Sequence, residues 1–177
     1  MIQVHSATIE DRDRIRDIYL DAFPDGEGES VAGLALELLG QKATPETLSL
    51  KAVEQGRMIA HASFSPVAID HHEGLQGYIL APLAVAPGSQ KQGVGTLLIE
   101  HGRQALVKRG VAVVFVYGDP AYYGRFGFSA DNASRFSPPY PLQYPFGWLA
   151  LNLDEYDIAG APFSIACVPA LRDPALW

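Results

Sequence analysis

Apolar residues along this chain follow two periodicities, and together they predict a mixed α/β fold. Spacings of three and four residues, as in Ile15, Ile18 and Tyr19, indicate amphipathic helices. These helices are expected at about residues 8–23, 30–39 and 92–109. Shorter apolar or alternating stretches predict strands at residues 1–6, 48–53, 58–69, 77–86, 111–116, 148–153 and 163–168.

The order of these elements predicts how the strands pair. A glycine-containing turn at residues 54–57 joins two strands as an antiparallel hairpin. Residues 111–116 are continuously apolar, which is typical of a strand buried on both faces. The long helix before them requires that this strand run parallel to residues 77–86, with a right-handed crossover. A mixed, mostly antiparallel sheet with one parallel βαβ unit is therefore expected.

Composition limits the class of protein. The chain has 177 residues, of which 48% are hydrophobic and 19% charged, which fits one folded domain. No run approaches the ~18 apolar residues of a membrane span, and the N-terminus lacks a signal-peptide pattern. A cytoplasmic protein is the expectation. Cys167 is the single cysteine, which excludes an internal disulfide, and the His71-His72-Glu73 run is interpreted as a solvated turn, so no metal is predicted.

Charge separates two parts of the chain. The formal net charge of −7 argues against nucleic acid or an anionic membrane as the main partner. Residues 90–110 nevertheless carry four basic side chains against Glu100 alone. A basic helix start in an acidic body suits a polyanionic cofactor and leaves acidic surface for a cationic substrate. An ordinary solvated helix face explains Arg103, Lys108 and Arg109 about equally well.

Residues 81–96 carry the clearest chemical signal, because an apolar strand runs through a glycine-bearing loop into a helix. Glycines admit a ligand close to the backbone, and the first N–H groups of a helix favour anions. The loop has the outer glycine spacing of a Walker A motif, but Val94 and Gly95 replace its Lys and Ser/Thr. As a dinucleotide fingerprint it fails at Leu98, which stands in place of the third glycine.

A third pattern, Gln90-x-x-Gly93-x-Gly95 after the strand end Leu83-Ala84-Val85, resembles the GNAT superfamily of acyl-coenzyme A N-acyltransferases. The resemblance implies a GNAT-like sheet flanked by helices, with the cofactor loop on the parallel βαβ unit. It implies pyrophosphate contacts at Gln90, Lys91, Gln92, Gly93, Val94, Gly95 and Thr96. It implies pantetheine and thioester contacts at Leu83, Ala84 and Val85.

A second motif strengthens the resemblance, which covers about residues 1–130. In residues 118–128, Tyr123 lies four residues before Gly127-Phe128, as in GNAT enzymes, and the run looks like that of a bacterial subgroup whose substrates are mostly unassigned. The resemblance implies that Tyr123 donates a proton or hydrogen bond to the departing sulfur. A purely packing role for Tyr123 is the alternative, and Tyr122 is interpreted as a packing residue.

Two features of the predicted enzyme stay open in the sequence. The general base could be Glu27, Glu29, His61 or a chain of water molecules. Residues 131–177 form an arm rich in prolines and aromatic residues, followed by the last strands. This arm could line an acceptor pocket or cover a homodimer interface.

The sequence thus predicts a single-domain N-acetyltransferase. It would move an acetyl group from acetyl-CoA to a small-molecule or peptide amine, by direct attack in a ternary complex. The alternatives are a non-catalytic acyl-CoA-binding sensor, transfer of another acyl group, and a hydroxyl acceptor.

Overall fold

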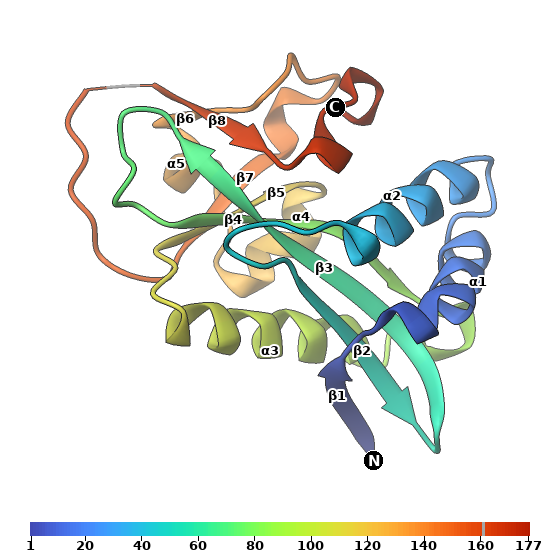
Figure 1. The fold of residues 1–177 in the computed structure, drawn as a ribbon. Helices are drawn as coiled ribbons and strands as arrows, with labels where there is room; N and C mark the ends of the chain where they lie inside the picture. Colours follow the sequence, from blue (N-terminus) through green and yellow to red (C-terminus); the bar gives the residue numbers. More distant parts are fainter. Residues whose placement is uncertain (161) are drawn as a thin grey trace. The chain divides into compact units, whose positions relative to one another are not determined.

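The computed structural model describes residues 1–160 and 162–177, which form two compact units (Figure 1). Unit 1 comprises Met1–Phe64 and Ala81–Ala105, and unit 2 comprises Ser65–Leu80 and Leu106–Trp177. Two strands and the long helix α3 run through both units. That the whole chain acts as one acyltransferase domain stays a prediction.

The strands pair as a mixed sheet in the order β1-β2-β3-β4-β5-β7, and β8 pairs with β3 and β6. Their bounds are β1 Ile2–Ser6, β2 Leu48–Glu54, β3 Arg57–Ile69, β4 Gly77–Val85, β5 Val113–Tyr117, β6 Phe136–Ser137, β7 Trp148–Asn152 and β8 Phe163–Cys167. The predicted hairpin between β2 and β3 is confirmed, and so is the parallel pairing of β4 with β5. The predicted fold class is therefore confirmed.

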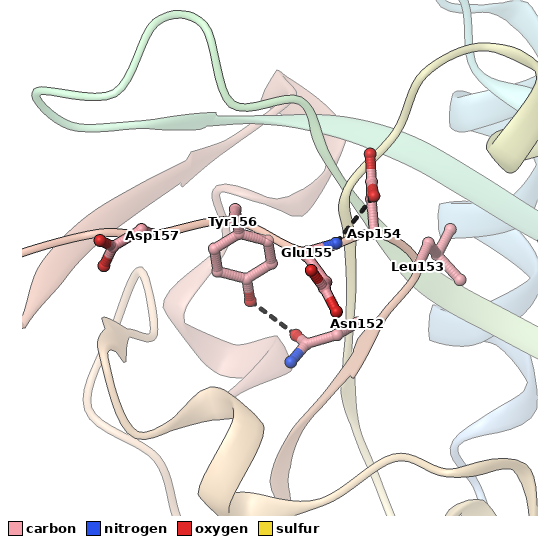
Figure 2. A pocket seen from close by; sticks show the side chains of 6 residues that line it. All are labelled: Asn152, Leu153, Asp154, Glu155, Tyr156 and Asp157. Carbon is pink, nitrogen blue, oxygen red and sulfur yellow. Dashed lines mark hydrogen bonds between the residues drawn. The ribbon is translucent and has the colours of Figure 1, made fainter.

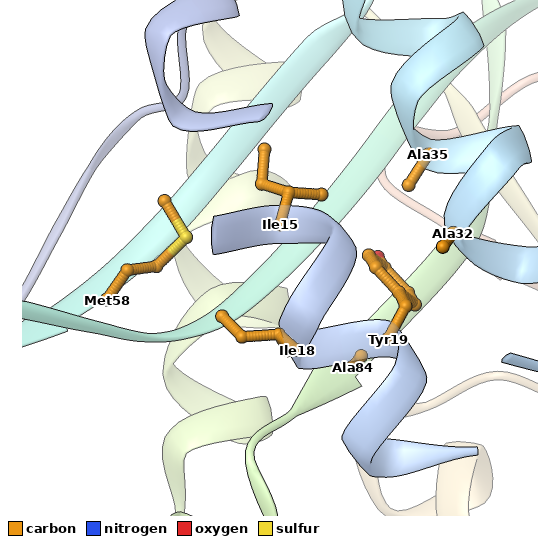
Figure 3. Packing of buried hydrophobic residues seen from close by; sticks show 7 residues of the cluster. All are labelled: Ile15, Ile18, Tyr19, Ala32, Ala35, Met58 and Ala84. Carbon is orange, nitrogen blue, oxygen red and sulfur yellow. The ribbon is translucent and has the colours of Figure 1, made fainter. Parts of the chain in front are cut away.

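Helices α1 (Arg12–Ala22) and α2 (Gly28–Gly40) cover one face of the strands in unit 1. Their apolar positions recur every three or four residues and enclose a core that also takes one side chain each from β3 and β4 (Figure 3). The members of this core are Ile15, Ile18, Tyr19, Ala32, Ala35, Met58 and Ala84. The alanines allow the helices to lie close to the strands.

A register shift in the β2–β3 hairpin decides which side chains face these helices. Ala52 pairs with Ala60, whereas Val53 pairs with Met58, so Ile59 is an extra residue in β3. The bulge places Met58 on the same face as His61, toward α1. The opposite face carries Phe64, whose ring lies against α3 (Val94–Lys108).

In unit 2, β5 is buried and joins β4 on one side to β7 on the other. β7 runs antiparallel to it, with Val113 opposite Asn152 and Tyr117 opposite Trp148. The ring of Phe115 stacks on Trp148 with centroids 5.2 Å apart. Phe136, in the short strand β6, adds an edge contact to Phe115 at 4.9 Å. The core of this unit is thus partly aromatic.

Several boundaries differ from those predicted. A 3-10 turn, η1 (Ile9–Asp11), precedes α1, because the Thr8 N–H donates to Asp11 Oδ2 over 2.8 Å and holds a tighter first turn. The sequence does not predict strand β6, since two residues are too short for a periodicity. Within the described residues, none of the helices combines the length and apolar character needed to cross a membrane.

Candidate active site

The loop from β4 to α3 is held by its own glutamine side chains. Gln90 Nε2 donates to the Val85 carbonyl over 3.1 Å, and Gln92 Nε2 donates to the Gly88 carbonyl over 3.0 Å. The backbone is left-handed at Lys91 (φ 61°) and at Gly93 (φ 80°), a conformation that glycine adopts without steric cost. These contacts bring the end of the predicted pantetheine strand and the predicted pyrophosphate loop together in unit 1.

The loop presents a row of free backbone donors. In the part of the chain that the structure describes, the N–H groups of residues 91–96 have no hydrogen-bond partner, and the first bond into the helix runs from Leu97 N to Gly93 O over 3.0 Å. The first turn of α3 carries no acidic side chain, and Lys91 is exposed beside it. Free donors, the positive end of the helix dipole and a lysine together suit a phosphate group.

Strand β4 extends beyond its pairing with β5. The parallel pairs are Gly77–Val113, Tyr78–Val114 and Ile79–Phe115, whereas β4 continues to Val85. Ala84 faces the α1–α2 core, so the half-buried side chains of Leu83 and Val85 lie on the other face of the strand. The backbone of β4 past Ile79 therefore has groups that β5 does not occupy.

Tyr123 lies in unit 2 at the end of α4 (Pro120–Tyr123), which directly follows β5. Asp119 caps this short helix by accepting a 2.9 Å hydrogen bond from Ala121 N. The Tyr123 ring makes edge contacts with Tyr122 (4.9 Å) and Phe128 (5.8 Å). The surrounding rings fix the ring of Tyr123 in place.

The hydroxyl of Tyr123 is suited to donate a proton. Among the described residues it has no hydrogen-bond partner, so its proton is not committed to another group. Burial raises the pKa of this phenol above its ordinary value, and the negative charge of Asp119 acts in the same direction. The side chain therefore stays protonated at neutral pH.

His61, one of the candidate bases, is fully buried in unit 1. Its Nδ1 lies 2.9 Å from Tyr19 Oη and its Nε2 lies 2.8 Å from Ser49 Oγ, so both ring nitrogens are engaged. Burial lowers the pKa of His61 to about 4, although the charge of Asp11 acts to raise it. The geometry identifies His61 as a neutral structural residue.

The two glutamates proposed as bases lie at the start of α2. Glu29 forms a 2.7 Å ion pair with Arg16, and both side chains are exposed. Glu27 is exposed at the N-cap of the helix, and the backbone N–H of Val31 donates to its carbonyl over 3.0 Å. The ion pair uses only Oε1 of Glu29, so both glutamates keep a carboxylate oxygen that can accept a proton.

The aromatic arm divides into buried and exposed residues. Phe136 and Trp148 belong to the core of unit 2, and Trp148 Nε1 donates to the Phe136 carbonyl over 2.9 Å. Tyr144 and Phe146 are exposed, with ring centroids 5.9 Å apart. Phe136 and Trp148 therefore fill the core, and Tyr144 and Phe146 are the aromatic side chains of this group that are free to line a pocket or an interface.

An acidic hollow of about 1010 Å³ lies after β7 in unit 2 (Figure 2). Its lining residues are Asn152, Leu153, Asp154, Glu155, Tyr156 and Asp157. Tyr156 Oη donates to Asn152 Oδ1 over 2.6 Å, and Glu155 N donates to Asp154 Oδ1 over 2.8 Å. None of the predicted site residues lines this hollow. Among the described residues, no group of three or more His, Cys, Asp and Glu side chains could hold a metal ion.

The amino-acid sequence of this chain is similar to those of known acetyltransferases. The sequence model of the acetyltransferase (GNAT) family matches residues 12–128. The uncharacterized N-acetyltransferase YjhQ of Escherichia coli is 34% identical over 153 residues, which are 84% of this chain and 83% of YjhQ.

Two solved structures share the fold over nearly the whole chain. One is the GNAT family N-acetyltransferase YhbS of Escherichia coli in complex with CoA, with a TM-score of 0.81, 27% identity, and coverage of 98% of this chain and 92% of that chain. The other is a GNAT family acetyltransferase of Brucella melitensis in complex with acetyl-CoA, with a TM-score of 0.68, 29% identity, and coverage of 96% and 97%.

Proposed function

Because the chain belongs to the acetyltransferase (GNAT) family, we propose that it transfers an acetyl group from acetyl-CoA to an amine. The observation that carries this proposal is the row of unpartnered N–H groups at residues 91–96. Acetyl-CoA supplies the acetyl group as a thioester, and its pyrophosphate is the anion that such a row of donors fits. The complexes of YhbS and of the Brucella melitensis protein support the same choice.

The chain holds the cosubstrate along two connected segments. Residues 91–96 donate backbone hydrogen bonds to the pyrophosphate, and Lys91 adds a positive charge. The backbone of Leu83, Ala84 and Val85 aligns the pantetheine arm and polarises the thioester carbonyl. These groups are preorganised, because the loop is held by Gln90 and Gln92 rather than by the ligand.

Tyr123 completes the transfer. The amine nitrogen bonds to the acetyl carbon, the carbon–sulfur bond breaks, and the Tyr123 hydroxyl gives its proton to the departing sulfur. Because burial raises its pKa, the phenol is protonated before the transfer, and the phenolate left after it takes a proton back from water. The proton lost by the amine leaves through Glu27, Glu29 or water, since His61 is enclosed.

Binding is tested by thermal shift with CoA, acetyl-CoA and NAD. Both coenzyme A ligands should raise the melting temperature, and NAD should leave it unchanged. Stabilisation by NAD without any by CoA would overturn the assignment. Binding of acetyl-CoA without thiol release across a panel of amines would instead identify a non-catalytic sensor.

Catalysis is tested at Tyr123, with Tyr122 as the matched control in the same motif. In an assay of free thiol release, Tyr123→Phe should lower kcat by about 10²-fold or more, because the donor is removed. The CoA-induced thermal shift should stay the same. Tyr122→Phe should leave both quantities near the wild-type values. A wild-type rate for Tyr123→Phe rules out the proton-donor role.

A further inference from the structure

Gly118 lies directly against the ring of Tyr123. A Cβ atom added at Gly118 would stand 2.4 Å from Tyr123 Cε2 and 2.9 Å from Cδ2. Carbon atoms in van der Waals contact are about 3.5–4.0 Å apart, so any side chain at this position would force the ring to move by about 1 Å. The ring occupies the space that the missing side chain leaves.

The backbone of Gly118 does not itself require glycine. The residues with positive φ include Gly127 but not Gly118, so alanine can adopt the conformation found here. The proximity of Tyr123 is therefore what excludes a side chain. Gly124, in the same motif, has a helical φ of −58°, and a Cβ atom added there would meet nothing within 4 Å.

A second glycine holds Gly118 in place. The Gly118 N–H donates to the Gly147 carbonyl over 2.9 Å. A Cβ at Gly147 would stand 2.9 Å from the Gly118 carbonyl oxygen and 3.1 Å from Cε1 of Tyr117. The segment that leads into β7 can therefore approach the end of β5 closely only because Gly147 carries no side chain.

From these contacts we propose that Gly118, fixed by Gly147, is a positioning residue that sets where the Tyr123 hydroxyl lies. The inference rests on the proposed role of Tyr123 as proton donor. A displacement of about 1 Å in a catalytic group can lower a rate by about 10²-fold, so the absence of a side chain at Gly118 is a requirement of the reaction as well as of packing.

A kinetic double-mutant cycle tests this. Gly118→Ala should lower kcat by about 10- to 100-fold with little change in the KM for acetyl-CoA, because the ring moves away from the sulfur. In the Tyr123→Phe background the same change should cost no further activity, since the hydroxyl is already absent. Gly124→Ala is the matched control and should keep the wild-type kcat.

The outcomes of the cycle are distinct. A wild-type kcat for Gly118→Ala overturns the proposal. The proposal is also overturned if Tyr123→Phe lowers kcat and Gly118→Ala, added to that variant, lowers kcat further by the same factor as in the wild type. Full activity of Tyr123→Phe overturns the proposed function of Tyr123 and this inference with it.

Thermal unfolding provides a readout that does not depend on activity. Gly118→Ala should lower the melting temperature while Tyr123 is present and have little effect in the Tyr123→Ala background, where the obstructing ring is gone. If Gly118→Ala does not fold but the double variant does, the proposal is supported. If neither folds, or if both backgrounds lose the same stability, glycine is needed for another reason and the proposal is overturned.

Discussion

Acidification should destabilise this protein through a single buried side chain, His61. Of the five histidines, His61 alone is buried, whereas His5, His71 and His101 are exposed and His72 is half-buried. Its ring is neutral and bonded to Tyr19 and Ser49. Protonation would bury a charge and would break the hydrogen bond that the ring accepts.

The size of the effect follows from the two pKa values of His61. The folded value is about 4 and the ordinary value, expected in the unfolded chain, is 6.5. Between these values the unfolded state binds more protons, so stability falls as the pH falls through this range. Linkage gives a loss of about 2 kcal/mol from pH 7 to pH 5, which rises to roughly 3 kcal/mol below pH 4.

Urea unfolding followed by circular dichroism at pH 7, 6 and 5 measures this loss. His61→Gln cannot titrate, so the wild-type protein should lose about 2 kcal/mol more than this variant between pH 7 and pH 5. His5→Gln, at an exposed position, should lose stability in parallel with the wild type. If His61→Gln also loses stability in parallel with the wild type, His61 does not titrate as a buried neutral group and the reasoning fails.

Two further predictions concern glycines. Gly102→Ala should lower the free energy of unfolding by about 1–3 kcal/mol, because its Cβ would stand 2.3 Å from the Phe64 ring. Gly33→Ala, on the exposed surface of α2, should raise the free energy of unfolding by up to about 1 kcal/mol, because alanine favours the helix more than glycine does. Equal melting temperatures for these two variants would contradict this. Gly93→Ala should lower the free energy of unfolding by about 1–2 kcal/mol, because φ is 80° there. It should also weaken CoA binding measured by calorimetry. Unchanged affinity would mean that the loop geometry does not govern binding.

Much of the fold could be predicted because periodicity is a local property. The three-residue spacing of Ile15 and Ile18 and the continuous apolar run of β5 each depend on neighbours in the sequence. The loop at residues 87–96 could also be predicted, since the first turn of any helix leaves N–H groups without partners inside the helix. The GNAT resemblance drawn from these residues is confirmed by the family match.

The roles of individual polar residues could not be predicted in the same way. His61 is a candidate base from its residue type alone, but its environment depends on Tyr19 and Ser49, which approach from two other elements. The register shift that turns Met58 toward α1 likewise has no local signature in β3. The cost of burying a charge depends on every neighbouring atom, so it is decided only when the elements pack.

The sequence by itself thus determined the order of helices and strands, the glycine-bearing loop before α3 and the position of Tyr123 in its motif, because each follows from residues close together in the chain. Only the tertiary structure decided that His61 is neutral and enclosed, and that Tyr123 rests on Gly118, which Gly147 holds in turn. These properties come from steric contact and desolvation between distant segments, which local sequence patterns do not encode.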